Sequence, residues 1–380
     1  MRTVQLGEIA DIDRWGVDPT SVSPDTRYLG LEHIERGGRI IGSSTVADAE
    51  LKSTKFRFTS DHVLYGKLRP NLGKISRPAF TGVCSTDILP IRPGENLDRN
   101  YLAHYLSQKG MVDFAASQAT GANLPRLNPT VLASFPIPLP GLDEQRRIAS
   151  ILDHADALRT KRRQALAHLD SLTQSIFHEM FGELPLATDF GNVIRTGPTN
   201  GLYKPQSAYG TGTPILRIDG FSKGRISPRP WRRVRLTRDE EDRYALKVGD
   251  IVVNRVNALS HLGKSALVES LDEPSVYESN MMRISLNEGA ALPEYVIAWF
   301  QSRSAKQQVL SRAKKAINQA SINQTDVRSL LMPLPSLDQQ LQFSTRIRKL
   351  KRIHVTLSRG LDLDDEIFAT LQSRAFRGEL

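Results

Sequence analysis

The residues PLPGLDEQ at 138–145 recur 195 residues later as PLPSLDQQ at 333–340. Around these copies, the segments 121–145 and 316–340 align without a gap. Other pairs occur in the same order: YLGLEHIERGGRI (28–40) with ILRIDGFSKGRI (215–226), NLGK (71–74) with HLGK (261–264), and FGEL (181–184) with FRGEL (376–380). This order predicts a tandem repeat, which constrains the fold more than any other feature.

Each repeat is predicted to contain a globular part followed by a helical part. The globular parts, about 140 residues each, mix short β-rich runs (87–93 and 250–256) with Gly, Pro and Asn turns and one late helix, near 101–116 and 293–313. The helical parts are expected to start at Asp143 and Asp338, each placed as an N-cap after a proline. The predicted fold class is α+β: two globular α/β domains joined by two long antiparallel coiled-coil helices in a pseudo-two-fold tandem repeat.

Both helical parts carry apolar residues at alternating steps of three and four. Such a seam needs a partner helix along its length, and an antiparallel pair within the chain is the simplest arrangement. A helix that packs only on its own globular domain is the alternative. In the first part the seam is broken only by Arg162; the two predicted seams are Ile148, Ile151, Ala155, Leu158, Ala165, Leu169, Leu172 and Ile176, and Phe343, Ile347, Leu350, Ile353 or His354, Leu357, Leu361, Phe368 and Leu371.

The charge balance favours a polyanionic partner. Lys and Arg number 51 against 41 acidic residues, which gives a net charge of +10, and a field of that sign attracts nucleic acid. There is no apolar run of about 18 residues and no signal-peptide pattern at the N-terminus. The single cysteine, Cys84, fits a reducing cytoplasm. The eight histidines show no metal-ligand spacing, so we expect no metal site.

Several stretches of the sequence match a catalytic motif only in part. The stretch 258–265 (ALSHLGKS) lacks the first glycine of a phosphate-binding loop. Asn128-Pro129 begins like the Asn-Pro-Pro-aromatic loop of adenine methyltransferases, but Thr130 and Val131 end the match. We therefore expect a chain without catalytic residues. The alternative is a stand-alone Mg²⁺-dependent nuclease of the PD-(D/E)xK type, which would use Asp25, Glu50 and Lys52.

Basic and amide side chains occur on loops at equivalent places in both repeats. Arg, Asn and Gln read base edges, whereas Lys suits phosphate contacts. A solvated loop would explain any one of these residues, and a coiled-coil adaptor without DNA contact is a further alternative. The paired occurrence favours DNA binding, and the predicted DNA-binding residues are Lys67, Arg69, Asn71, Lys74, Asn123, Arg126, Asn128, Arg255, Asn257, Lys264, Lys314, Lys315, Asn318, Gln319, Ser321 and Asn323. The arginines around Trp231, in PRPWRRVRLTR (228–238), are either a DNA-backbone surface or a salt-bridged ribbon against DEEDR (239–243).

The chain resembles the specificity subunits of type I restriction–modification enzymes. The resemblance rests on FPIPLPGLDEQRRIASILDHADALRTKRR and LDSLTQSIFHEMFG within 135–182, their weaker copy at 332–380, the opening LGEIADI (6–12) and TGANLPRLN (120–128). It covers essentially the whole chain. The second helical part departs from the first, because Gln340-Leu341-Gln342 stands where Gln145-Arg146-Arg147 is expected.

The resemblance implies a non-catalytic DNA-recognition subunit that reads an asymmetric bipartite site in double-stranded DNA. Residues 1–140 and 184–335 would be target-recognition domains, and 141–183 and 336–380 the conserved helices whose length sets the spacing of the half-sites. Two modification subunits would bring S-adenosylmethionine, and restriction subunits would bring ATP and Mg²⁺; no cofactor is expected in this chain and no membrane partner.

Overall fold

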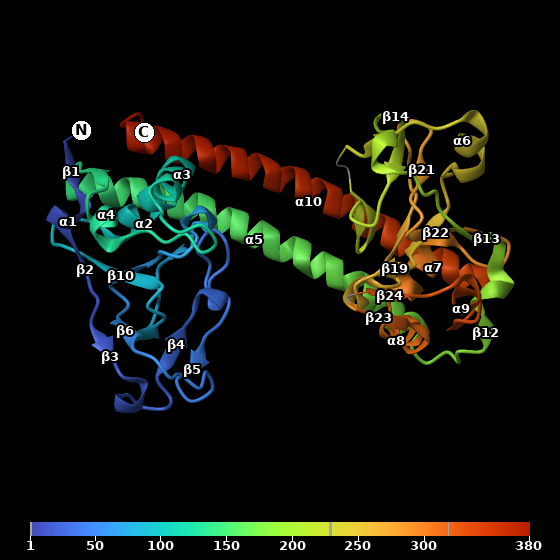
Figure 1. Ribbon diagram of the computed structural model, residues 1–380, viewed down its shortest axis with the longest axis horizontal. Helices are drawn as coiled ribbons and strands as arrows, with labels where there is room; N and C mark the ends of the chain where they lie inside the picture. Colours follow the sequence, from blue (N-terminus) through green and yellow to red (C-terminus); the bar gives the residue numbers. More distant parts are fainter. Residues whose placement is uncertain (1, 228–229, 318) are drawn as a thin grey trace. The chain divides into compact units, whose positions relative to one another are not determined.

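The computed structural model describes residues 2–227, 230–317 and 319–380. Contacts divide the chain into two units: unit 1 contains residues up to Arg162 together with Arg359–Leu380, and unit 2 contains Arg163–Ser358. Each unit combines a globular α/β part with one segment of each long helix, α5 (Leu142–Phe181) and α10 (Leu337–Arg377) (Figure 1). The predicted architecture of two mixed domains linked by long helices is confirmed.

The globular part of unit 1 is built on two sheets, ordered β2–β10–β7–β8 and β3–β6–β9–β4–β5, while β1 pairs with β11. All four residues of β7 and the first four of β10 are buried, as expected for central strands with apolar residues on both faces. The strands are β1 (Thr3–Gln5), β2 (Ala10–Ile12), β3 (Gly16–Val17), β4 (Arg27–Leu29), β5 (Ser44–Thr45), β6 (Lys55–Phe58), β7 (Val63–Gly66), β8 (Ile75–Ser76), β9 (Gly82–Cys84), β10 (Ile88–Pro93) and β11 (Pro136–Pro138).

Unit 2 also places its strands in several sheets, and its two longest strands, β13 and β14, are longer than any strand of unit 1. Its sheets run β13–β22–β18–β20–β16–β15, β17–β14–β21 and β19–β24–β23, and β12 pairs with β25. The strands are β12 (Thr188–Asp189), β13 (Ile194–Asn200), β14 (Tyr209–Leu216), β15 (Phe221–Ser222), β16 (Gly224–Ile226), β17 (Arg232–Val234), β18 (Ile251–Asn254), β19 (Val256–Asn257), β20 (Ser265–Leu267), β21 (Val276–Tyr277), β22 (Met281–Leu286), β23 (Lys314–Ala316), β24 (Gln319–Ser321) and β25 (Leu331–Met332).

The late helix predicted in each globular part is present but is broken in two. In unit 1 the break lies at Gln108, which has extended backbone angles; in unit 2 a new helix starts where the Ser302 side chain accepts the Ala305 N–H. The helices are α1 (Leu6–Ile9), α2 (Arg99–Ser107), α3 (Lys109–Ser117) and α4 (Pro129–Ala133) in unit 1, and α6 (Arg238–Tyr244), α7 (Pro293–Phe300), α8 (Arg303–Arg312) and α9 (Gln324–Arg328) in unit 2.

The duplicated PLPGLDEQ junction builds the same hydrogen-bonded corner in both units. In unit 1, the fully buried Gln145 accepts the Asp98 N–H (2.8 Å) and donates to the carbonyls of Asn96 and Pro140 (both 2.9 Å). The Tyr101 hydroxyl donates to the Pro138 carbonyl at 2.7 Å. These bonds fix the entry of α5 onto the domain.

The same bonds recur in unit 2. Gln340, also fully buried, accepts the Leu292 N–H (2.8 Å) and donates to Ala290 and Pro335 (3.2 and 3.0 Å), and Tyr295 donates to Pro333 (2.5 Å). The repeat in sequence is therefore a repeat of specific contacts.

Both long helices begin before the aspartates that were predicted as N-caps. Helix α5 starts at Leu142 and the Gln145 N–H already bonds to the Gly141 carbonyl, so Asp143 lies in the first turn. Helix α10 starts at Leu337, and the Ser336 hydroxyl accepts the Gln339 N–H. The prediction placed each N-cap two residues too late. Gly141 and Ser336 stand directly before the helices, so each aspartate lies in the first turn, where its negative charge interacts favourably with the positive end of the helix dipole.

Within each unit, α5 and α10 run antiparallel. In unit 1 Arg147 bonds to the Leu380 carbonyl and Arg162 pairs with Asp364. In unit 2 Asp170 pairs with His354, and the ring of Phe177 contacts that of Phe343. In both pairs of contacts, the residue number rises along one helix and falls along the other.

The predicted seam of α10 is correct, with His354 rather than Ile353 turned inward: Ile353 is 49% exposed. The predicted seam of α5 is partly wrong, because Leu158 and Leu172 are 61% and 39% exposed. The inward face of α5 also includes Leu152, which is fully buried in the core of unit 1. It also includes Arg159 and Arg162, which bond to Asp365 (2.5 Å) and Asp364 (2.8 Å) of α10.

Candidate nucleic-acid interface

The predicted DNA-binding residues gather at the same structural position in both units. This position lies where the central strand ends (β7 or β18) and meets the segment that precedes a short helix (α4 or α9). In unit 1 the Gly66 N–H bonds to the Lys74 carbonyl (2.8 Å) and the Leu127 N–H to the Lys67 carbonyl (2.9 Å). The equivalent bonds in unit 2 run from Asn254 to Lys264 (2.8 Å) and from Ile322 to Arg255 (3.0 Å). Segments 50 or more residues apart in sequence are thus held side by side.

In unit 1 this surface exposes three of the predicted side chains on tight turns. Arg69 has a left-handed backbone (φ 51°) and precedes a short 3₁₀ turn, η3 (Pro70–Leu72), and its N–H bonds to the Pro125 carbonyl. Asn71 and Asn123 are exposed nearby. The backbone is pinned while the side chains reach solvent, which suits contact with a rigid duplex.

Arg126 is also exposed, but its guanidinium is held by a carboxylate. Its Nε donates to Asp87 Oδ1 (2.9 Å) and its Nη2 to Asp87 Oδ2 (3.3 Å). Asp87 raises the pKa of Arg126, through these hydrogen bonds and through its charge. Asp87 was not among the predicted residues, and nothing in the sequence marks it, since the two residues lie 39 positions apart.

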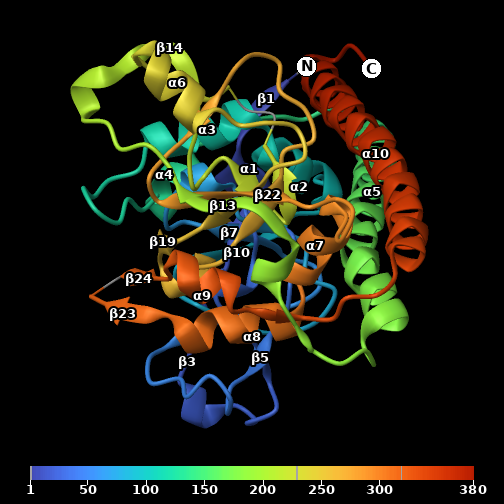
Figure 2. The same ribbon diagram turned by 90° about the vertical axis from the view of Figure 1, so that its right-hand side faces the viewer.

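In unit 2 the surface is a small sheet, β19–β24–β23 (Figure 2). Lys314, Lys315 and Gln319 are exposed on the β23–β24 hairpin, whose register places Lys315 opposite Ala320 and Lys314 opposite Ser321. Asn257 lies on β19, opposite Ala320. Asn318 lies outside the described residues.

Five of the predicted residues also have structural roles. The Asn128 and Asn323 side chains cap helices α4 and α9, accepting the N–H groups of Thr130 (2.9 Å) and Asp326 (2.9 Å). Arg255 Nη1 donates to the Ser279 carbonyl at 3.2 Å. The two remaining residues are lysines that bond inward: Lys74 Nζ donates to the Leu31 carbonyl (2.6 Å), and Lys264 Nζ lies 5.2 Å from the ring centroid of Phe221. Burial lowers the pKa of Lys264.

The arginine-rich stretch around Trp231 does not pair with the acidic DEEDR segment. Its strand β17 pairs with β14, and DEEDR forms most of helix α6. Arg233 Nη1 instead bonds to Glu273 (3.1 Å), so the proposed ribbon against 239–243 is wrong in its partner. Arg229 lies outside the described residues.

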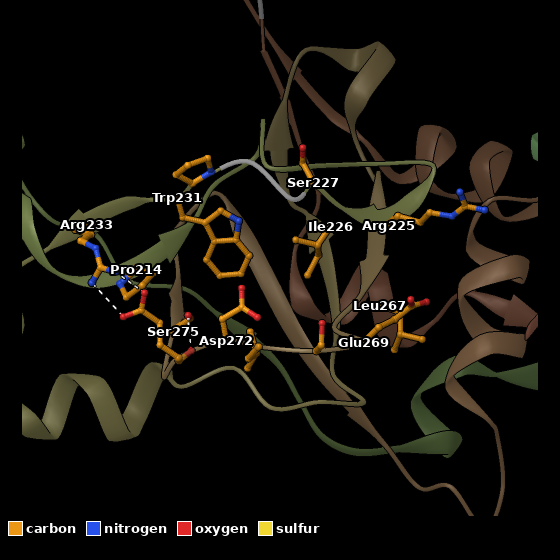
Figure 3. A pocket seen from close by; sticks show the side chains of 14 residues that line it. Pro214, Arg225, Ile226, Ser227, Trp231, Arg233, Leu267, Glu269, Asp272 and Ser275 are labelled. Carbon is orange, nitrogen blue, oxygen red and sulfur yellow. Dashed lines mark hydrogen bonds and ion pairs between the residues drawn. The ribbon is translucent and has the colours of Figure 1, made fainter. Parts of the chain in front are cut away.

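A cavity of about 570 Å³ opens beside Trp231, whose indole ring points into it together with the Asp272 carboxylate (Figure 3). Glu269 and Glu273 also line it, beside Arg225 and Arg233. The acidic side chains make this hollow unsuited to phosphate, so it does not belong to the surface described above.

The residues of the alternative nuclease site lie in turns and loops of unit 1. Asp25 lies in a turn, Glu50 has a left-handed backbone (φ 43°), and Lys52 lies in an exposed loop. Within the part of the chain that the structure describes, no group of three or more His, Cys, Asp or Glu residues could hold a metal ion. The nuclease interpretation is not supported.

The structure therefore combines two α/β units in tandem with two long helices, and each unit exposes basic and amide side chains at an equivalent position. Residues 1–168 match the model of the type I restriction modification DNA specificity domain. The EcoKI specificity subunit of Escherichia coli K12 is 27% identical over 334 residues, which cover 80% of this chain and 68% of that protein. The EcoDI specificity subunit of Escherichia coli is 32% identical over 187 residues, which cover 48% of this chain and 41% of that protein.

Solved structures show the same fold. A chain from a type I restriction–modification assembly matches all of this chain and 98% of its own length, with a TM-score of 0.59 at 18% identity. The specificity subunit from M. genitalium matches with a TM-score of 0.55 at 14% identity, covering 99% of this chain and 96% of its own. Over most of its length the chain is similar in sequence to specificity subunits of type I restriction–modification enzymes, and it shares the fold of the solved chains.

No helix in residues 2–227, 230–317 and 319–380 is both long and apolar enough to cross a membrane.

Proposed function

We propose that the chain reads an asymmetric, bipartite site in double-stranded DNA, with one half-site for each unit. Residues 1–140 and 184–335 act as the two target-recognition domains. The observation that carries this proposal is one surface built twice on the same backbone hydrogen bonds but with different side chains. Arg69 and Arg126 of unit 1 align with Asn257 and Ser321 of unit 2, so the two half-sites differ in sequence.

The basic residues supply affinity and the amide and guanidinium groups supply discrimination. Lysine contacts to phosphate release counterions, which makes binding depend steeply on salt. Bidentate arginine and amide contacts distinguish base pairs in the major groove. A net charge of +10 adds a long-range attraction toward the duplex.

The helices, 141–183 and 336–380, serve as the conserved scaffold. Two modification subunits dock there and bring S-adenosylmethionine for adenine methylation, and restriction subunits add ATP- and Mg²⁺-dependent translocation and cleavage. The chain itself recognises the DNA site and works with these subunits in the cytoplasm.

The experiment that tests this function is duplex binding by the complex of this chain with its modification subunits. We expect specific binding that weakens by orders of magnitude between about 50 and 200 mM salt. Asp25→Ala, at the rejected nuclease position, should leave binding and methylation unchanged. Binding that does not respond to salt, or cleavage by the isolated chain that Asp25→Ala abolishes, would contradict the proposal.

A further inference from the structure

The surface of unit 1 contains one side chain whose orientation is fixed from three directions. The backbone of Arg126 exchanges two hydrogen bonds with Thr120: its N–H donates at 2.8 Å and its carbonyl accepts at 3.0 Å. On the other side it forms a bridge with Leu68. The Asp87 carboxylate then holds the guanidinium through both of its oxygens.

Asp87 is itself anchored. Its carbonyl accepts the Lys67 N–H (2.9 Å), and its own N–H donates to the Ser85 hydroxyl (3.3 Å) at the start of strand β10. The pair is accessible, because the side chain of Arg126 is 44% exposed and that of Asp87 24%. A guanidinium held in this way loses little conformational entropy when it binds a ligand.

The hydrogen bonds to Asp87 determine which donors are left. A guanidinium has five N–H groups in a planar fork. Asp87 accepts from Nε and from one hydrogen of Nη2, so the end formed by Nη1 and the second hydrogen of Nη2 remains available. Two parallel donors on this end match the O6 and N7 acceptors of guanine in the major groove, and no other base pair offers two adjacent acceptors on one base there.

We propose that Arg126 reads a guanine in the half-site of unit 1 and that Asp87 is the residue that positions it. This inference rests on the proposed function. Phosphate contact is a weaker explanation, because a carboxylate beside the guanidinium repels a phosphate, whereas guanine presents neutral acceptors.

Unit 2 lacks this pair. The position of Asp87 is taken by Asn280, whose carbonyl accepts the Arg255 N–H (2.9 Å) as Asp87 accepts that of Lys67. The position of Arg126 is taken by Ser321, which pairs with Val256 as Arg126 pairs with Leu68. The buttressed arginine is therefore a feature of one half-site, and its loss should alter one position of the recognised sequence.

The test measures initial methylation rates by the complex of this chain with its modification subunits. The substrates are duplexes in which each base pair of the recognised site is changed in turn. Arg126→Ala should remove about 10- to 100-fold of discrimination at a single G·C pair. Arg126→Lys should lose most of it as well, because lysine lacks the planar fork. Asp87→Asn should weaken discrimination at that same pair while leaving the other half-site intact.

Asp113→Asn is the matched control, because it removes one exposed carboxylate of unit 1, paired with Lys109. It should change no preference. The inference is overturned if Arg126→Ala slows methylation equally on all duplexes, if the position that relaxes is not a guanine, or if Asp87→Asn relaxes no position. In each of these cases two half-sites would still be recognised and the proposed function would stand; the function itself fails if the unmodified complex shows no preference at any position.

Discussion

At the scale of single residues, the buried glutamines of the two junctions explain why PLPGLDEQ occurs twice. The fully buried side chain of each glutamine bonds to one N–H and two carbonyls of the corner between domain and helix. The penalty for leaving such groups unsatisfied exceeds the net gain of an ordinary hydrogen bond. The repeated motif is thus a requirement of the corner between domain and helix.

Gln145→Ala should lower the free energy of unfolding by about 2–4 kcal/mol, because the fully buried side chain makes three hydrogen bonds to the backbone that alanine cannot replace. Gln340→Ala should have a similar effect on unit 2. Urea unfolding followed by circular dichroism measures both. The control is Gln164→Ala, on the exposed face of α5, which should change the free energy by less than about 0.5 kcal/mol. Equal effects at all three positions would contradict this account of the junction.

The residues of the two proposed DNA-binding surfaces could be predicted only in part. Repetition located both surfaces, because glycine, asparagine and basic residues recur at matching positions. All four asparagines are exposed, so the repeat could not separate Asn128 and Asn323, which cap helices, from Asn71 and Asn123, which lie on turns. Capping and base reading use the same side chains, and only the backbone conformation distinguishes them.

At the scale of elements, helix α5 shows how a sequence pattern can mislead. The apolar residues at 148, 151, 155 and 158 gave a regular heptad. Leu158 is exposed, whereas the inward face includes Leu152, with Arg159 and Arg162 bonded to carboxylates of α10. Charged residues are not counted in an apolar pattern, so the ion-paired centre of the helix pair was not predictable from periodicity. The late helices, the central strands and the α10 seam were predictable because their apolar residues are buried.

Leu152→Gln and Leu158→Gln distinguish the observed face from the predicted one. Leu152 is fully buried in the core of unit 1, so its replacement should cost about 2–5 kcal/mol of stability. Leu158→Gln makes the same chemical change at an exposed site and should cost less than about 0.5 kcal/mol. Thermal unfolding of the two variants provides the comparison. A larger loss of stability for Leu158→Gln than for Leu152→Gln would support the heptad seam predicted from the sequence.

His354 should make the stability of unit 2 depend on pH. Burial, with nearby Arg225 and Lys223, lowers its pKa below 6.5, although Asp170 opposes this shift. The unfolded chain therefore binds the proton more readily, and the folded state loses stability as pH falls from about 6.5 toward the folded pKa. His354→Gln removes this contribution, so the stability of the variant relative to the natural chain should be greater at pH 5.5 than at pH 7.5. Chemical unfolding of both proteins at pH 5.5 and pH 7.5 measures this difference in stability. The same difference at both pH values would contradict the lowered pKa of His354.

At the scale of the whole molecule, both long helices pass from one unit into the other. Under the proposed function, the length of chain in these helices sets the gap between half-sites. The sequence predicted this organisation because a tandem repeat with two helical parts leaves few alternatives. It could not give the bases, since these depend on arrangements such as Asp87 with Arg126 that join distant segments.

Inserting four residues into both helices, after Arg163 and after Ser358, should widen the recognised gap. Four residues add about one turn and about 6 Å, which corresponds to about two base pairs, and they keep each helix face nearly in register. Methylated-site sequencing measures the gap. The same four residues inserted in the exposed loop after Gly42 should leave it unchanged, and an unaltered gap in the double insertion would contradict the role of the helices.

The central claim is that each unit reads its own half of one DNA site. Its most direct test is single-molecule methylation sequencing of a host that carries this chain and its partner subunits. The natural chain is compared with one variant in each unit: Arg69→Gly, because glycine accepts the left-handed backbone at this position, and Gln319→Ala, which removes an exposed amide from strand β24. We expect two different half-sites separated by a fixed gap, with each variant relaxing only one of them. A single uninterrupted motif, or relaxation of both halves by either variant, would contradict the claim.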